Sequence, residues 1–137
     1  MRRKLLYVVT EDWSFTLHRL PMARAARDAG YEVHVATRVV ECGRQIEAEG
    51  FILHPITLKR GSLNPIAMLR TVRDLRQIYR SLRPDIVHHV ALAPAVLGSL
   101  ASLGLSLRKL DALTGLGFIF TSATPRAQLL RPFVQRL

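Results

Sequence analysis

The sequence predicts an α/β protein with a Rossmann-like open parallel β-sheet and helices on both faces. Short apolar runs alternate with longer segments of helical periodicity, a pattern typical of β-α-β units. The short runs are apolar almost throughout, as expected of strands that are buried on both faces of a sheet. At 137 residues, the chain has the size of one domain with a self-sufficient core.

Five apolar runs are predicted to be the strands of this sheet. They are short, and most are bounded by glycine, proline or charged residues, which mark the ends of strands. The predicted strands are Lys4–Val9, Glu32–Ala36, Phe51–Ile56, Asp85–His88 and Lys109–Leu113.

Two helices are predicted in the first half of the chain. The first begins at Pro21 and ends before Gly30, because proline suits the first turn of a helix and glycine follows its last. We expect an irregular turn before Pro21, with Ser14 as a cap. The second spans about Cys42–Glu49 and ends at Gly50.

A third helix has the clearest sequence signals. Asn64 is a capping residue, Pro65 fits the first helical position, and apolar residues recur at helical spacing as far as Leu82. Its other side is predicted to be a basic outer face. The arginines assigned to that face are Arg70, Arg73, Arg76, Arg80 and Arg83.

The segment Val90–Leu107 carries no charge and is close to the minimum length of a membrane-spanning helix. Alanine, glycine and serine make up half of it and Pro94 lies near its start, so a helix packed against the sheet is the favoured interpretation. At the end of the chain, Pro125–Leu137 is predicted to be a helix kinked at Pro132.

The composition limits the classes of partner. A formal charge of +10, from 20 Lys and Arg against 10 Asp and Glu, suits phosphates, anionic lipids or nucleic acid. Nucleic acid is disfavoured, because no aromatic residues are interleaved with the basic ones. The single Cys42 cannot form an internal disulfide, and we assign it no role.

The loop after the first strand is the first candidate site, because ligands of open parallel sheets bind at the carboxyl ends of the strands. This loop has no glycine to admit a pyrophosphate. Glu11, Asp12 and Trp13 could bind a sugar through carboxylates and an aromatic face, although Asp12 could equally cap a helix and Trp13 could lie in the core. His18 and Arg19 could hold a phosphate, or be a solvated surface pair.

Two further candidate loops follow the fourth and fifth strands. His88, at the end of a strand, could accept a proton, bind a phosphate or have only a structural role, and His89 is a further candidate ligand. Adjacent strand residues point to opposite faces, so the two histidines cannot readily share a metal, and no metal site is predicted. The other loop could bind an anion or be a tight turn. It consists of Thr114, Gly115, Leu116 and Gly117.

The sequence resembles the N-terminal half of GT-B glycosyltransferases of the family 4 type. The resemblance covers nearly the whole chain and rests on "VVTEDWSFTLHRLPMARAARDAGYEVHVAT", "RPDIVHH" and "ALTGLGFIFTS". It implies that residues 1–137 form a single acceptor-binding, Rossmann-like domain. The C-terminal domain of the family, which binds the nucleotide sugar and carries a pair of glutamates, has no counterpart in this chain.

The resemblance implies transfer of a sugar from a nucleotide diphosphate sugar, with retention, to a lipid-linked or polysaccharide-precursor acceptor. No cofactor or metal is implied, and the co-substrate would be bound mainly by the absent half. His88 would be the catalytic residue, as acceptor-side base or phosphate ligand. Many members have a glycine pair in the first loop, which Glu11, Asp12 and Trp13 replace, so that contact with the donor cannot be carried over.

On this reading the chain alone is expected to be inactive, with a missing C-terminal domain or a separate donor subunit as its partner. The alternative is a stand-alone, non-catalytic module that binds a phosphorylated sugar, a lipid or a partner protein. We expect a cytoplasmic location, with peripheral attachment to anionic lipid on the inner face of the membrane. The basic residues expected at that surface are Lys59, Arg60, Arg70, Arg73, Arg76, Arg80 and Arg83.

Overall fold

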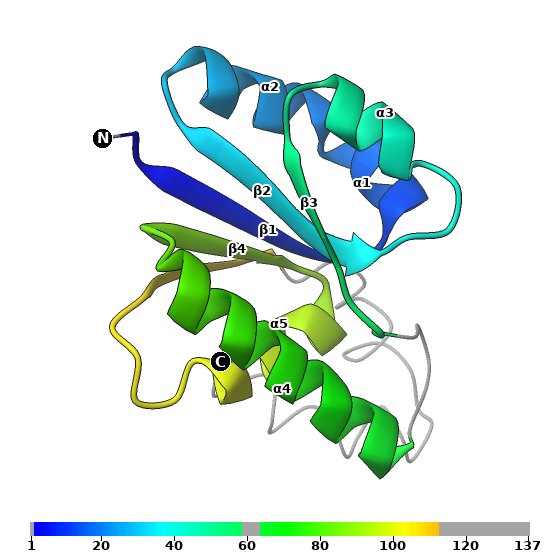
Figure 1. Ribbon diagram of the computed structural model, residues 1–137, viewed down its shortest axis with the longest axis vertical. Helices are drawn as coiled ribbons and strands as arrows, with labels where there is room; N and C mark the ends of the chain where they lie inside the picture. The colour runs from blue at the N-terminus through cyan, green and yellow to red at the C-terminus, as the bar shows by residue number, and fades with distance from the viewer. Residues whose placement is uncertain (1, 59–63, 113–137) are drawn as a thin grey trace, which may run out of the picture.

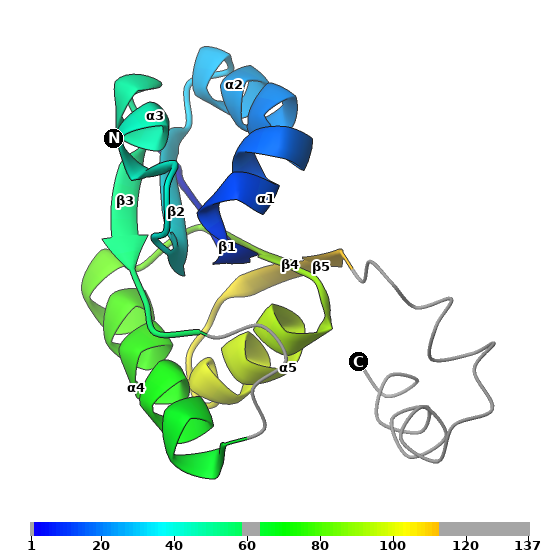
Figure 2. The same ribbon diagram turned by 90° about the vertical axis from the view of Figure 1, so that its right-hand side faces the viewer.

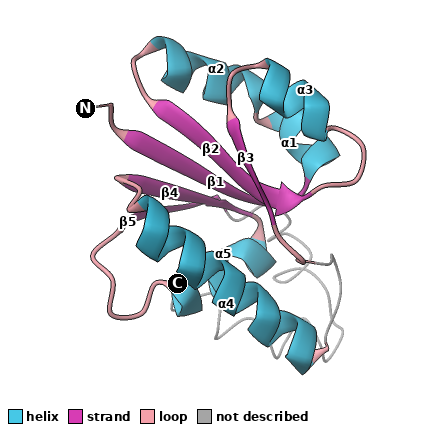
Figure 3. Cartoon of the chain, viewed as in Figure 1, coloured by secondary structure: helices cyan, strands magenta, loops and turns pink. Residues whose placement is uncertain are grey.

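The chain forms a five-stranded, fully parallel sheet between two layers of helices (Figures 1 and 3). The computed structural model describes residues 2–58 and 64–112. The strand order is β3-β2-β1-β4-β5. This arrangement confirms the α/β, Rossmann-like fold class predicted from the sequence.

All five predicted strands are present, with ends that shift by one or a few residues. The strands are β1 Lys4–Glu11, β2 Glu32–Arg38, β3 Ile52–Pro55, β4 Ile86–Val90 and β5 Arg108–Ala112. The central strand β1 pairs with β2 on one side and with β4 on the other. Its residues belong alternately to two separate apolar clusters, with Tyr7 in one and Leu6 and Val8 in the other.

Helices cover both faces of the sheet, as Figure 2 shows from the side. In the part of the chain that the structure describes, three helices pack on one face and two on the other. The first layer packs on the cluster that contains Tyr7, and the second on the cluster that contains Leu6. The helices are α1 Asp12–His18, α2 Leu20–Asp28, α3 Gly43–Ala48, α4 Pro65–Leu82 and α5 Leu92–Ala101.

The segment before Pro21 differs from its prediction. It is the separate helix α1, which begins at Asp12 with Glu11 as its N-cap, so Ser14 lies inside the helix and does not cap it. At this start, Oδ1 of Asp12 accepts a hydrogen bond from the amide of Trp13, and Oδ2 accepts hydrogen bonds from amides of the loop before α3.

The helix α4 has the predicted bounds, and the Asn64 side chain accepts a hydrogen bond from the amide of Ile66 at 3.0 Å. Most of the basic outer face is also as expected, since Arg70, Arg73 and Arg80 are exposed. Arg76 is the exception: it is half-buried and donates hydrogen bonds to the carbonyl oxygens of Ala101 and Leu103 at the end of α5. Lys59 and Arg60 lie outside the described residues.

The uncharged segment Val90–Leu107 contains α5, which has 10 residues and packs against the sheet and α4, as expected. Val90 is the last residue of β4, and a turn follows Ala101. In the part of the chain that the structure describes, no helix has the length and apolar character needed to cross a membrane. The predicted helix Pro125–Leu137 lies outside that part.

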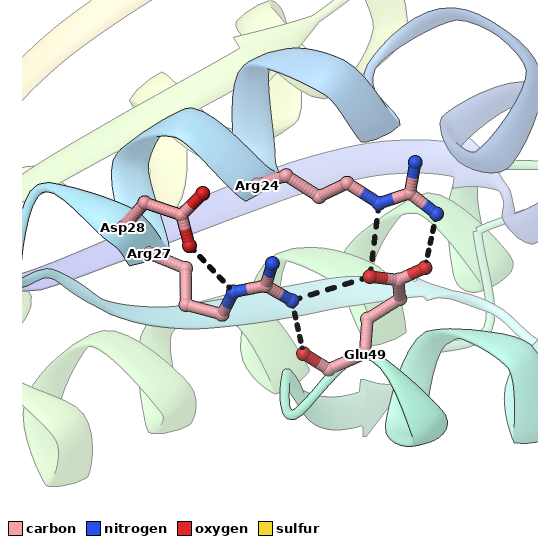
Figure 4. A network of polar contacts seen from close by, with 4 residues as sticks. All are labelled: Arg24, Arg27, Asp28 and Glu49. Carbon is pink, nitrogen blue, oxygen red and sulfur yellow. Dashed lines mark hydrogen bonds and ion pairs between the residues drawn. The ribbon is translucent and has the colours of Figure 1, made fainter.

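An ion-pair network joins α2 to the end of α3 (Figure 4). The Glu49 carboxylate accepts hydrogen bonds from both Nε and Nη2 of Arg24. Arg27 donates hydrogen bonds to the carboxylate and to the backbone carbonyl oxygen of Glu49. These bonds, led by that from Arg24, lower the pKa of Glu49 to about 2. Arg27 also lies over the ring of Phe51, so the network fixes the first helical layer to the start of β3.

Candidate functional site

The candidate site lies where the strand order reverses, between β1 and β4. The chain runs from β1 to β2 and β3 on one side, and then crosses to β4 and β5 on the other. The connections that leave β1 and β4 therefore diverge at the carboxyl ends of these strands, the place at which open parallel sheets bind their ligands and which is here called the crevice. Three of the predicted site residues, Glu11, His88 and Arg19, come from the elements around this crevice.

His88 is the central side chain of this site. The prediction that it ends a strand is wrong, because β4 continues to Val90 and His88 is its middle residue. His88 lies opposite Tyr7 in the β1–β4 register, and the two rings stack with centroids 5.1 Å apart. Only 4% of His88 is exposed, and its Nε2 atom is buried with no hydrogen-bond partner among the described residues. A buried ring nitrogen without a partner is uncommon and requires an explanation, such as a ligand.

Arg19 provides a positive charge beside this histidine. It lies at the junction of α1 and α2, and its Nε atom is likewise buried without a partner among the described residues. Burial lowers the pKa of His88, and the charges of Arg19 and His89 lower it further, while Asp111 acts in the opposite direction. His88 is therefore neutral at pH 7 and has a free lone pair or a free N–H at Nε2.

The backbone at the end of β4 is strained. Ala91 has φ 79° and ψ 169°, a conformation that is adopted almost only by glycine. This residue is the N-cap of α5, so the first amides of that helix, at Leu92 and Ala93, have no intrahelical partners. Strained backbone of this kind costs about 1–3 kcal/mol and is concentrated at functional sites.

The loop after β1 has two different carboxylates. Glu11 accepts a hydrogen bond from the indole N–H of Trp13, so these two predicted ligands pair with each other. Asp12 is fully buried, and its Oδ2 accepts hydrogen bonds from the amides of Val40, Glu41 and Cys42 at 2.7–2.9 Å. Asp12 thus holds the β2–α3 loop against α1, and its carboxylate does not face the crevice. Those amides belong to residues 28 to 30 positions further along the chain, so sequence reading could not find them.

His89 points to the opposite face of the sheet from His88. Its Nδ1 lies 2.7 Å from a carboxylate oxygen of Asp111, and its Nε2 lies 2.7 Å from the hydroxyl oxygen of Tyr79. Burial lowers the pKa of His89, so the ring is neutral, Nδ1 donates to Asp111, and Nε2 accepts from Tyr79. This buried network joins β4, β5 and α4, and the structure does not bring His89 into the crevice with His88.

The remaining predicted ligands are not gathered at His88. His18 is exposed at the end of α1. The four residues Thr114 to Gly117 lie outside the described residues. Sequence reading missed Tyr7 and Ala91, since a tyrosine within an apolar run and an alanine after a strand carry no functional signal. Among residues 2–58 and 64–112, no three His, Cys, Asp or Glu side chains are grouped to hold a metal ion.

Solved structures with this arrangement include sugar transferases and an unrelated enzyme. A glycosyltransferase from Rickettsia africae has a TM-score of 0.65 at 20% identity over 80% of this chain, and SnogD, a glycosyltransferase from Streptomyces nogalater, has 0.63 at 21% over 99%. The C-terminal domain of a hydrogenase from Pyrococcus furiosus has 0.57 at 16% over 81% of this chain and 91% of its own. At these identities, the likeness defines the fold alone.

The fold is Rossmann-like and of the GT-B type, and the chain corresponds to the N-terminal domain of that type. Residues 4–137 match the family described as "Glycosyl transferase 4-like", and the chain belongs to that family. It spans 29% of the Rickettsia enzyme and 39% of SnogD. A sequence comparison with curated proteins finds no match.

Proposed function

We propose that this domain is the acceptor-binding half of a glycosyltransferase. The reaction is transfer of a sugar from a nucleotide diphosphate sugar, with retention and without a metal, to a lipid-linked or polysaccharide-precursor acceptor. The observation that carries the proposal is the buried, unpartnered Nε2 of His88, the middle residue of β4, beside Arg19. Membership of the glycosyl transferase 4-like family supports the reaction class.

In the proposed mechanism, His88 contacts the acceptor. Because the ring is neutral, Nε2 can take the proton of an acceptor hydroxyl or hydrogen-bond a phosphate oxygen, and the positive charge of Arg19 favours an acceptor that carries a phosphate. The stacked Tyr7 ring fixes the orientation of the imidazole. The amides at the start of α5 are free to bind an anionic group at the same edge. Donor binding belongs to a second domain or subunit.

The test is replacement of His88 in the full-length protein. We expect His88→Ala to lower turnover by about 10² or more if His88 is a general base. In His88→Gln, the side-chain amide can still form a hydrogen bond but cannot act as a base. Turnover that is lost in His88→Ala and recovered in His88→Gln would therefore assign His88 a phosphate-binding role. Steady-state kinetics with an assay for nucleotide release give the result. An unchanged rate in His88→Ala, at an unchanged melting temperature, would return His88 to a structural role.

The length of the natural polypeptide separates the enzyme from its alternative, a stand-alone binding module. The intact mass measured from the source cells decides this, because the present chain accounts for 15.4 kDa. A mass near 40 kDa, about two domains of the usual size, is expected for the enzyme. A mass of 15.4 kDa would favour the module or a separate donor subunit.

We propose that the first half of α4 attaches the domain to an anionic membrane. Ile66 and Leu69 are 71% and 70% exposed, and they lie beside the exposed Arg70 and Arg73 on the same helical face. An apolar pair flanked by arginines suits the interface of a bilayer, where basic residues near the surface contribute about 1 kcal/mol each.

We expect the protein to sediment with vesicles that contain phosphatidylglycerol, in a salt-sensitive way, and not with neutral phosphatidylcholine vesicles. Ile66→Ser with Leu69→Ser should reduce the vesicle partition coefficient at least about fivefold, since about 1 kcal/mol corresponds to that factor. The matched control is Val39→Ser with Val40→Ser, which removes an exposed apolar pair from the β2–α3 loop. Equal recovery with both vesicle types would contradict the proposal.

A further inference from the structure

A basic pocket lies at the amino ends of the strands, at the edge of the sheet opposite to the crevice with His88. It has a volume of about 690 Å³. The amino ends of β1, β4 and β5 meet here with the carboxyl end of α4, at the left in Figure 1. This volume is in the range of pockets that bind small molecules.

Four arginines from three parts of the fold line this pocket. They are Arg3 before β1, Arg80 and Arg83 at the end of α4, and Arg108 at the start of β5. No ion pair within the described part of the chain involves any of the four. A second hollow of about 500 Å³ shares Arg80 and Arg83 and adds Arg2 and Lys4. The positive charge is therefore concentrated at one place and is not neutralised there.

The acidic residue in the lining of the pocket does not neutralise this positive charge. Asp85 is the single carboxylate that lines the pocket in the part of the chain that the structure describes. One of its oxygen atoms, Oδ2, accepts a hydrogen bond from the backbone amide of Lys4 at 2.7 Å. One carboxylate against four guanidinium groups leaves a net positive pocket, in which the like charges repel one another until an anion binds.

The carbonyl groups at the end of α4 explain only part of this arrangement. A helix C-terminus favours basic residues, which accounts for Arg80 and the neighbouring Arg83. It does not account for Arg3 and Arg108, which flank the amino end of β4 from the two neighbouring strands. An anion that is held between the strands and the helix accounts for all four.

The backbone at Arg83 supports a role for its side chain. Arg83 has φ 51° and ψ 60°, the left-handed conformation that a helix end usually assigns to glycine. Arginine is less favourable than glycine in this backbone conformation. We infer that the arginine side chain has a role here that glycine could not fill. Its position places the guanidinium group at the wall of the pocket.

The rest of the lining indicates the kind of anion. Beside the arginines the pocket has an apolar part, made by Pro84, Ile86, Leu105 and Leu107. Guanidinium groups bind phosphate oxygens in pairs of parallel hydrogen bonds, whereas an apolar wall suits the organic part of a ligand. We propose that this pocket binds a phosphate ester, either a soluble organic phosphate or the headgroup of a lipid, at a site separate from the proposed acceptor site.

Binding of a soluble anion to the full-length protein tests the site. Isothermal titration calorimetry with glycerol 3-phosphate and with pyrophosphate should give binding that Arg80→Ala with Arg108→Ala weakens by about 10-fold or more. The matched control, Arg38→Ala with Arg44→Ala, removes the same charge from positions outside both hollows and should change the affinity less than about twofold. Equal loss in both double variants, or no binding of either anion, would overturn the proposal.

Arg83→Gly provides a second, independent test. We expect weaker phosphate binding together with a melting temperature raised by about 2 °C, because glycine relieves the left-handed conformation. Loss of binding therefore could not be attributed to unfolding. Unchanged affinity in Arg83→Gly would contradict the role of this residue in the pocket.

A vesicle experiment distinguishes the two sources of the phosphate. Vesicles with phosphatidic acid should compete with pyrophosphate, and depend on Arg80 and Arg108, if the ligand is a lipid headgroup. Pyrophosphate binding that such vesicles do not displace assigns a soluble ligand. The apolar pair Ile66 and Leu69 should be replaced by serine in both arms, so that the other proposed membrane contact does not contribute.

Discussion

Replacement of Gly98 by alanine is expected to destabilise the domain by about 3–5 kcal/mol. A Cβ atom at this position of α5 would lie 2.1 Å from Nε2 of His89 and 2.8 Å from the hydroxyl oxygen of Tyr79. The imidazole cannot withdraw, because Asp111 binds its other nitrogen and the ring is fully buried. The substitution must therefore move α5 or break the buried network.

Urea unfolding followed by circular dichroism measures this effect. Gly43→Ala is the matched control, because a Cβ there would meet mainly the side chain of Val39, which is exposed and can move. His89→Ala makes room for the new methyl group, so the double variant with Gly98→Ala should cost at least about 1 kcal/mol less than the sum of the single variants. A cost below about 1 kcal/mol for Gly98→Ala alone would mean that α5 is not packed this closely.

Replacement of Asp12 by alanine is expected to cost about 3–4 kcal/mol. The carboxylate accepts hydrogen bonds from four backbone amides, three of them in the loop that leads into α3. Without it, the amides of Val40, Glu41 and Cys42 lose a charged acceptor within a buried environment. Glu47→Ala, an exposed carboxylate on α3, is the control and should change stability by less than about 0.5 kcal/mol.

The pH dependence of unfolding gives Asp12 a distinct signature. Burial tends to raise the pKa of its carboxyl, but the hydrogen bonds from the amides of Cys42, Val40, Glu41 and Trp13 outweigh burial, and the pKa lies below the ordinary value of 3.8. The stabilisation is therefore complete above that ordinary pKa and is lost as the pH falls through the lower folded value. Unfolding free energies measured from pH 7 to pH 2 should show this loss in the wild type and not in Asp12→Ala. Parallel curves for the two proteins would contradict it.

The ends of helices and strands were predicted most accurately where capping residues, proline or glycine mark them in the sequence. The helix α4 has the predicted ends because Asn64 and Pro65 mark its start, and the residue before Pro84 cannot readily continue a helix. The break between α1 and α2 lies next to Pro21, where the sequence predicted a helix to start, but the helical form of the segment before it could not be predicted in this way. Asp12, at the start of α1, binds partners that are distant in the sequence, and local reading favoured Ser14 as the cap.

Candidate site residues could be named from the sequence, but their arrangement could not be predicted. The rule for parallel sheets selected the loop after β1 and the end of β4, and strand alternation separated His88 from His89. Which histidine faces the crevice could not be read, because both faces of a buried parallel strand are apolar. The difference between the two histidines depends on the residues that enclose His89. These residues, Tyr79, Gly98 and Asp111, come from three different elements.

The order of the strands has a consequence for self-association. In the part of the chain that the structure describes, β3 and β5 are the outer strands, and an outer strand is a template on which another chain can add. Pro55 at the end of β3 has no amide hydrogen to offer, and β5 begins with the charged pair Arg108 and Lys109. Each border of the sheet thus carries a feature that opposes strand addition, which favours a domain that stays dispersed at high concentration and does not form β-aggregates.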